Sequence, residues 1–313
     1  MNQFHLPVMA AQCVQFLAPR PGGVYVDATV GGGGHSLALL KAEPQIRLFA
    51  FDQDEEAIAQ AAEKLDAYRD RVDIIKSNFS RLRTELALRR IKSIDGIIFD
   101  LGVSSHQLDN AARGFSFDQE AELDMRMDRS QSLTAAMVVN TLPQAELARI
   151  FKEYGEEQNA ARIARAIVAA RKKQPLRTTM ELARLIEAVA GKGSRDSLKT
   201  KVRIFQSLRI QVNRELEVLE PTLKDAINLL TTGGRIVVLS YHSLEDRIVK
   251  NTLRDAASGC NCPPNVLTCV CGRTRRLKLL SKGALLASAG EVEENNRSRS
   301  ARLRAAEKIK GES

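Results

Sequence analysis

The sequence is poor in the residue types that mark secreted, membrane-bound and base-stacking proteins. Its 313 residues include no tryptophan, and aromatic residues make up only 4%, so few side chains could stack on single-stranded bases. Five cysteines are too few for a disulfide-stapled scaffold of this length. No run approaches the ~20 apolar residues of a membrane span, and residues 1–23 lack the basic and apolar parts of a signal peptide. We therefore expect a folded cytoplasmic protein without membrane attachment.

Positive charge is concentrated in two segments. Residues 141–214 hold 16 basic and 7 acidic residues, and residues 273–310 hold 11 basic and 4 acidic residues, whereas the whole chain has a net charge of +9. The rest of the chain is therefore net negative. Such concentration favours a polyanionic partner, because neutralising phosphates releases counterions. Solvated helix faces are an equally good explanation for any single basic run.

Short apolar runs alternate with helix-compatible segments in the first hundred residues. The expected strands are residues 24–28, 48–51, 72–75 and 94–101, and the expected helices are residues 36–41, 55–65 and 79–88. This alternation predicts an α/β fold with a doubly wound, mainly parallel sheet covered on both faces. Right-handed crossovers place the carboxyl ends of its strands along one edge, where ligands bind.

The alternation stops after Leu101. Residues 102–128 are polar and rich in turns, which predicts an ordered functional loop. Helical periodicity follows over residues 133–190 and 202–230. Gly233 and Gly234 are predicted to stop that last helix before a fifth strand at residues 235–240.

The simplest organisation is a sheet domain interrupted by a basic helical insertion. We expect a first part at residues 1–130, a helical insertion at residues 131–200 and a second part at residues 201–313. In the tail, residues 277–286 and 301–309 fit a closing antiparallel hairpin, although the later segment is equally compatible with a basic helix.

The first candidate site motif is the turn after the first strand. Residues 27–35 read DATVGGGGH, and Asp52 ends the second strand. Glycines at a strand-to-helix turn allow a ligand close to the backbone, and such an acid can accept both ribose hydroxyls. The pattern predicts a nucleoside-bearing cofactor. The sixth position of Gly-x-Gly-x-x-Gly is Ser36, and no phosphate-binding lysine directly follows the glycines, which argues against NAD and against a phosphate-binding P-loop.

Two further motifs follow strands at the same predicted edge. Residues 99–107 read FDLGVSSHQ and place Asp100 beside the expected cofactor, where it could act on a substrate or cap a loop. Phe79 could cover a flat base or simply belong to the core. Residues 240–247 read SYHSLEDR, and within them His242 is more typical of a structural histidine than of a catalyst.

Four cysteines near the end of the chain form a possible structural zinc site. They are Cys260, Cys262, Cys269 and Cys271. Four thiolates so close could bind zinc tetrahedrally, but the spacing is Cys-x-Cys rather than the commoner Cys-x-x-Cys. Free or redox-labile thiols are the alternative, and we predict no catalytic metal. We expect Cys13 to be a small buried residue.

Taken together, the motifs resemble the RsmH (MraW) family of bacterial 16S ribosomal RNA cytosine-N4 methyltransferases nearly from end to end. The matching segments are HLPV (5–8), DATVGGGGH (27–35), FDLGVSS (99–105), QLD (107–109), RGFSF (113–117), LDMRMD (123–128), YGEE (154–157), RIARAI (162–167), FQSLRI (205–210), VN (212–213), SYHSLEDRIVK (240–250) and RSRSARLRAAEK (297–308). Gln12 and Asn296 depart from the family pattern, and both lie outside these segments.

The resemblance implies a class I methyltransferase fold that uses S-adenosylmethionine (AdoMet). It also implies methylation of the exocyclic amine of one decoding-centre (P-site) cytidine of 16S rRNA within the small ribosomal subunit. The sequence itself indicates no obligatory protein partner. Carried over by position, the implied AdoMet contacts are Gly33, Gly34, His35, Asp52, Phe79, Asp100 and Gln107.

The exocyclic amine of cytosine is a poor nucleophile because its lone pair is delocalised into the ring. An enzyme must therefore orient the amine with hydrogen-bond acceptors. We expect the loop from Asp100 to Ser105 to do this, with Asp100 the best single candidate and with the roles of Ser104, Ser105 and His242 left open. The Asp-Pro-Pro-Tyr motif of other amino methyltransferases is absent. A nucleotide-dependent oxidoreductase and an inactive ribosome-binding module are the alternatives, and cofactor binding separates all three.

Overall fold

The fold is built on one mixed sheet. The computed structural model describes residues 7–191, 195–259, 271 and 274–312. Within them the strands are β1 (Val24–Asp27), β2 (Arg47–Asp52), β3 (Val72–Lys76), β4 (Ile94–Asp100), β5 (Leu230–Ser240), β6 (Arg275–Leu279), β7 (Leu285–Leu286) and β8 (Arg302–Glu312). Their order is β3-β2-β1-β4-β5-β8-β6, and β7 pairs with β8. Strands β1 to β5 are parallel and β8 is antiparallel to its neighbours. The predicted mainly parallel, doubly wound sheet is confirmed.

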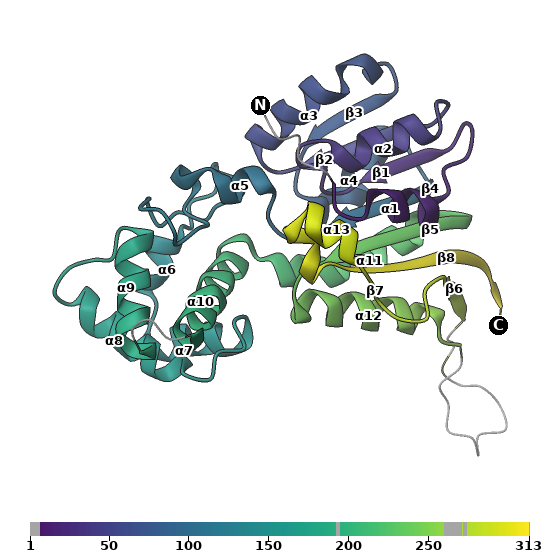
Figure 1. The fold of residues 1–313 in the computed structure, drawn as a ribbon. Helices are drawn as coiled ribbons and strands as arrows, with labels where there is room; N and C mark the ends of the chain where they lie inside the picture. Colours follow the sequence, from purple (N-terminus) through teal and green to yellow (C-terminus); the bar gives the residue numbers. More distant parts are fainter. Residues whose placement is uncertain (1–6, 192–194, 260–270, 272–273, 313) are drawn as a thin grey trace. The chain divides into compact units, whose positions relative to one another are not determined.

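Alternating side chains of the strands build one apolar core on each face of the sheet. Along β2, Leu48 and Ala50 join the core under α1 (Ala10–Leu17), α2 (Gly34–Ala42) and α3 (Glu55–Leu65). Phe49 and Phe51 join the opposite core under α4 (Leu82–Leu88), α11 (Glu215–Leu229) and α12 (Ser243–Ala257). Figure 1 shows α2 and α12 on opposite sides of the strands. Short elements complete the connections: η1 (Asp66–Tyr68), η2 (Phe79–Arg81), α13 (Ala289–Glu294) and η4 (Asn296–Ser300).

The direction of chain winding reverses at β1. Strands β2 and β3 lie on one side of β1, whereas β4 and β5 lie on the other. The connections that leave the carboxyl ends of β1 and β4 therefore run in opposite directions, which opens the crevice where ligands bind in such sheets. The glycine turn follows β1, and Asp100 ends β4.

The structure corrects the expectation for Gly233 and Gly234. Helix α11 already ends at Leu229, and both glycines lie inside β5, which starts at Leu230 rather than at 235. The pairing of β4 with β5 jumps from Ile94–Leu230 to Gly96–Arg235, so the glycines occupy an irregular stretch of the strand. Gly233 has a φ of +81°, a conformation that glycine adopts at no steric cost.

The tail forms the expected antiparallel pairing, since β6 and β7 both pair with β8, whereas the N-terminal region differs from expectation. Residues 302–312 form β8 and not a basic helix, because Leu303 and Ala305 point into one core and Ala306 into the other. Helix α1, which buries Cys13 and Leu17, was not predicted. The first 23 residues held no periodic pattern long enough to indicate it.

The sheet and the inserted helices form two compact units. The sheet unit comprises Met1–Gly102 and Leu216–Ser313, and the helical unit is Val103–Glu215. The helical unit contains α5 (Ser105–Asp109), η3 (Ala111–Arg113), α6 (Ala135–Thr141), α7 (Gln144–Glu153), α8 (Ala160–Arg171), α9 (Thr179–Ala190) and α10 (Arg195–Asn213). It extends beyond the predicted 131–200 on both sides, because Phe115 and Met125 from the loop and Leu208 from α10 belong to its apolar core. Among the described helices, none has the length and apolarity needed to cross a bilayer.

Candidate active site

Asp27 shapes the turn that follows β1. Its carboxylate is buried and accepts hydrogen bonds from the Thr29 N–H at 3.1 Å and from the Ser36 hydroxyl at 2.7 Å. Burial raises the pKa of Asp27. Between these anchors, Gly33 has a φ of +78° and serves as the N-cap of α2. Asp27 therefore holds the glycine turn in shape.

Asp52 ends β2 and touches the same turn. One of its oxygens accepts the N–H of Gly31 at 2.9 Å, and the other accepts the N–H of Asp54 at 2.9 Å. Burial raises the pKa of Asp52 to about 6, although these backbone donors act in the opposite direction. The acid and the glycines that the sequence suggested as one site are in direct contact.

Asp100 links the ends of three strands. Its Oδ1 accepts a hydrogen bond from the Tyr241 hydroxyl at 2.6 Å, and its Oδ2 lies 3.3 Å from Nε2 of His35. Its backbone N–H donates to the hydroxyl of Thr29 at 2.7 Å. The Asp100 side chain is 26% exposed, which leaves it accessible to a bound molecule.

His35 is buried beside Asp100 at the start of α2. Burial lowers its pKa, but the neighbouring Asp100 and Cys13 outweigh this effect, so the pKa of His35 stands well above its ordinary value. Neither ring nitrogen has an aligned hydrogen-bond partner within the part of the chain that the structure describes. Cys13 is buried as expected, and burial raises the pKa of its thiol. An imidazolium at this position balances the Asp100 carboxylate in a poorly solvated place.

Phe79 opens η2, and two residues separate it from the end of β3. Its ring meets Phe99 edge to face, with centroids 5.9 Å apart and planes at 84°. Phe79 is only partly buried. The side chain therefore belongs in part to the core and keeps a surface that could cover a flat base.

Gln107 belongs to the helical unit and caps α5. Its side-chain oxygen accepts the N–H of Ser104 at 2.9 Å, and the Ser104 hydroxyl accepts the N–H of Gln107 at 3.2 Å. The sheet unit thus brings together the glycine turn, His35, Asp52 and Asp100. Gln107, buried in the other unit, has a defined role in the cap of α5. The role of all these residues in cofactor binding stays a prediction.

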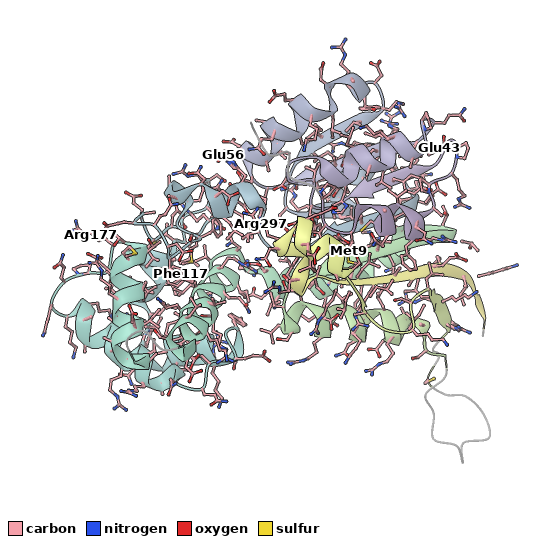
Figure 2. The ribbon with its side chains drawn as sticks, in the orientation of Figure 1. Met9, Glu43, Glu56, Phe117, Arg177 and Arg297 are labelled. Carbon is pink, nitrogen blue, oxygen red and sulfur yellow. The ribbon has the colours of Figure 1, made fainter. Side chains whose placement is uncertain are left out.

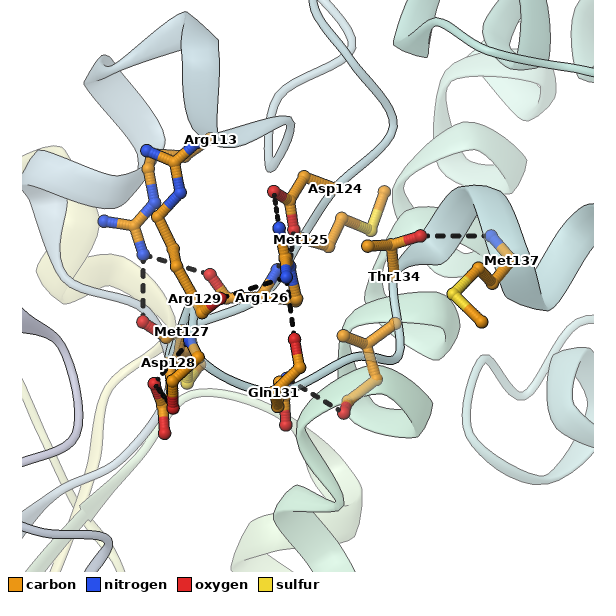
Figure 3. Close-up of polar contacts among 12 residues, drawn as sticks. Arg113, Asp124, Met125, Arg126, Met127, Asp128, Arg129, Gln131, Thr134 and Met137 are labelled. Carbon is orange, nitrogen blue, oxygen red and sulfur yellow. Dashed lines mark hydrogen bonds and ion pairs between the residues drawn. The ribbon is translucent and has the colours of Figure 1, made fainter.

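Polar side chains hold the loop between η3 and α6 of the helical unit in place, and Figure 3 shows their hydrogen bonds. The buried Arg113 guanidinium donates to the backbone carbonyls of Arg126 and Met127, both at 3.0 Å. Arg126 pairs with Asp124 through two hydrogen bonds of 2.6 and 2.9 Å, which lower the pKa of Asp124 against the effect of burial. Asn213 of α10 accepts the N–H of Met127 at 2.8 Å. These contacts account for the predicted order of this segment.

Several lysines and arginines of the helical unit are exposed. Figure 2 labels one of them, Arg177, at the edge of this unit. The exposed set includes Arg162, Arg165, Lys172, Lys173, Arg177, Arg184 and Lys199. Arg171, in contrast, is partly buried and donates to the carbonyls of Val139 and Leu142, both at 2.7 Å. Arg171 therefore holds helices together, whereas its two lysine neighbours are available at the surface.

Sequence reasoning missed Tyr241 as a member of this site. The motif at residues 240–247 was noticed, but its tyrosine was not connected with Asp100, which is 141 positions earlier in the chain. His242 is the N-cap of α12, in line with its expected structural role. The polar motif at the end of a strand was the only available signal for Tyr241.

The predicted zinc or thiol cluster falls largely outside the described residues. Cys260, Cys262 and Cys269 are not among them, whereas Cys271 is. Over the residues that the structure describes, no group of three or more histidine, cysteine or acidic side chains is arranged to hold a metal ion.

Known proteins resemble this chain over its whole length. The family model described as the MraW methylase family matches residues 2–309. Ribosomal RNA small subunit methyltransferase H of Geotalea uraniireducens is 51% identical over 312 residues, covering 99% of this chain and 100% of that protein. The protein of the same name from Carboxydothermus hydrogenoformans is 49% identical over 310 residues, covering 99% of both chains.

Among solved structures, an rRNA methylase from Streptococcus thermophilus superposes with a TM-score of 0.44 and 11% identity, covering 96% of this chain and 95% of that one. The family match of nearly the full length and the identities of about one half to the curated relatives confirm the resemblance that the motifs indicated. This chain belongs to the MraW methylase family.

Proposed function

We propose that this protein transfers a methyl group from AdoMet to the exocyclic N4 amine of a single decoding-centre (P-site) cytidine of 16S rRNA in the small ribosomal subunit. The observation that carries the chemistry is the meeting of Asp100, Asp52 and the glycine turn at the reversal point of the sheet. Family membership and the full-length identity to small subunit rRNA methyltransferases support the substrate. We place the reaction in the cytoplasm.

The residues of this edge suit AdoMet. Asp52 offers carboxylate oxygens beside the glycine turn for ribose hydroxyls, and Gly33 lets a ligand approach the backbone. The partly buried ring of Phe79 can cover the adenine base. His35 is buried, and its Nε2 lies 3.3 Å from Oδ2 of Asp100. Neither of its ring nitrogens has an aligned hydrogen-bond partner among the described residues. When bound, AdoMet supplies a methyl group made electrophilic by its attachment to a sulfonium.

Asp100 is the residue that we propose to orient the substrate amine. A carboxylate has about four acceptor positions, so the contacts with Tyr241 and His35 leave room for a further donor. Accepting an N–H of the amine would fix the direction of its lone pair and stabilise the positive charge that develops as the N–C bond forms and the S–C bond breaks. The amine then releases one proton to reach the neutral methylated product.

The helical unit is proposed to hold the rRNA around the target. Its exposed arginines and lysines can neutralise phosphates, which supplies affinity that does not depend on the base sequence. A single-stranded target base lowers the cost of placing it in a pocket, which for a stacked base is on the order of a few kcal/mol. In this proposal the sheet unit carries out methyl transfer and the helical unit binds the rRNA backbone.

The test is the transfer of a labelled methyl group from AdoMet to small subunits that lack the modification. Mass spectrometry of the digested rRNA then locates the product. We expect N4-methylcytidine at one position, and none with Asp100→Ala. AdoMet binding without any transfer would point to another substrate, and loss of both in the unaltered protein would favour an inactive binding module.

The variant Asp100→Asn distinguishes a role of Asp100 in orienting the substrate amine from a role in cofactor binding alone. If Asp100 orients the amine, this variant loses turnover by a larger factor than it loses AdoMet affinity. Equal losses of both would assign Asp100 to cofactor binding alone.

A further inference from the structure

Tyr241 contacts Asp100 through a short side-chain hydrogen bond. The hydroxyl donates to Oδ1 at 2.6 Å, a length typical of hydroxyl donors on a charged acceptor. Burial and the negative charge of Asp100 raise the pKa of Tyr241 well above its usual value. The hydroxyl therefore keeps its proton at every pH at which the protein would be assayed, and it acts only as a donor.

The N-terminus of α12 fixes the backbone from which this ring extends. The Tyr241 N–H donates to Oε2 of the buried Glu245 at 2.9 Å. Glu245 in turn forms a capping box with His242, whose Nδ1 accepts the Glu245 N–H at 3.4 Å. A phenol on a backbone anchored in this way has little freedom to turn away from Asp100.

A second anchor connects this helix end to the sheet. Asp246, the next residue of the motif, accepts hydrogen bonds from Arg304 at 2.7 and 3.1 Å and from Arg302 at 3.1 Å. Both arginines lie on β8, which pairs with β5. The polar motif at residues 240–247 is thus a set of contacts that holds Tyr241 at the carboxyl end of β5.

We propose that Tyr241 is a positioning residue for Asp100: its hydroxyl occupies one carboxylate oxygen, opposite His35 on the other, and so fixes the direction in which Asp100 presents its remaining acceptor positions. The proposal rests on the proposed function only in assuming that Asp100 contacts the bound cofactor or substrate. It also assigns a role to a motif that the reaction itself leaves without one.

The test compares Tyr241→Phe with a matched control, Tyr25→Phe. Tyr25 is fully buried whereas Tyr241 is partly buried, and the Tyr25 hydroxyl is also hydrogen-bonded, accepting the Arg20 N–H at 3.0 Å. Tyr25 lies near the start of β1. Two quantities are measured on the full chain: AdoMet affinity by calorimetry, and the single-turnover rate of methyl transfer to small subunits. A hydrogen bond to a charged group predicts a loss of about 10- to 100-fold for Tyr241→Phe in whichever quantity depends on Asp100. Tyr25→Phe should change neither by more than about twofold.

A double-mutant cycle with Asp100→Asn separates positioning from packing. If Tyr241 acts through Asp100, adding Tyr241→Phe to Asp100→Asn costs much less than it does alone. Full additivity, a wild-type Tyr241→Phe, or a wild-type Asp100→Asn would each overturn the proposal. Failure of the unaltered protein to methylate small subunits would refute the proposed function, while the affinity cycle would still report the coupling. If Tyr241→Phe does not fold, Glu245→Gln, which weakens the acceptor of the Tyr241 N–H, replaces it in the same cycle.

Discussion

The affinity for AdoMet should depend on the ionisation of Asp52. Burial raises the pKa of this carboxyl to about 6 in the protein without ligand. Ribose hydroxyls donate more strongly to a carboxylate than to a neutral acid, so binding favours the ionised form. Lowering the pH from 7 to 5 should therefore weaken binding, because the bound state must first remove the proton from Asp52.

The size of the effect follows from the pKa. A carboxyl with a pKa of about 6 is roughly nine-tenths ionised at pH 7 and roughly one-tenth ionised at pH 5. If only the ionised form binds, the affinity for AdoMet falls about tenfold over this interval. The pKa of His35 stands well above its ordinary value, and Asp52→Asn keeps His35, so any pH dependence that comes from His35 would survive in that variant.

Calorimetric titrations at pH 5, 6 and 7 measure the dependence, and binding at pH 6 should also release protons to the buffer. Asp52→Asn has no titrating group at this position, so its affinity should be lower at pH 7 and nearly independent of pH. Asp95→Asn is the matched control, because Asp95 accepts the Val24 N–H at 2.9 Å near the other end of β1. A wild-type affinity that changes less than twofold, or a slope that survives in Asp52→Asn, would refute the reasoning.

Three further predictions concern the remaining polar contacts. The double variant Lys172→Glu, Lys173→Glu should raise the Michaelis constant for small subunits at unchanged AdoMet affinity, which steady-state kinetics measures; an unchanged constant would remove this lysine pair from the interface. Arg171→Ala should instead destabilise the helical unit in thermal melts, because Arg171 donates hydrogen bonds to two backbone carbonyls. Asn213→Ala should lower the free energy of unfolding by about 2 kcal/mol, because the Met127 N–H and the Met125 carbonyl lose their buried hydrogen-bond partner. Residues 113–131 should then be cleaved faster by limited proteolysis, and cleavage at the wild-type rate would contradict this. Asp246→Asn should lower the free energy of unfolding by about 1–2 kcal/mol at pH 7. Arg304 and Arg302 lower the pKa of Asp246 against the effect of burial, so its contribution is present above the unfolded pKa and is lost as the pH falls through the folded pKa. Denaturant titrations at pH 7 and at a series of lower pH values should therefore show the difference between variant and wild type shrinking in acid.

Local sequence patterns were enough to predict much of the sheet unit. Alternating apolar residues and turn residues near β1 to β4 are short-range signals, because each strand buries side chains with a period of two and each turn needs glycine or a small polar residue. The same signals placed Asp52 and Asp100 at strand ends. A local pattern was misleading at Gly233 and Gly234, which were expected to stop a helix, because the pairing of β5 with β4 places both glycines inside the strand.

The sequence by itself therefore determined the class of fold, the family and the edge of the sheet at which the acids gather. Only the tertiary structure decided which groups meet there. Tyr241 and Asp100 are 141 residues apart, and the hydrogen bond between them exists because β5 pairs with β4 in one register. Likewise, Arg171 reads as one of three adjacent cations, yet packing turns it inward while Lys172 and Lys173 stay exposed. Such contacts depend on long-range pairing and burial, which a local pattern of residue types does not encode.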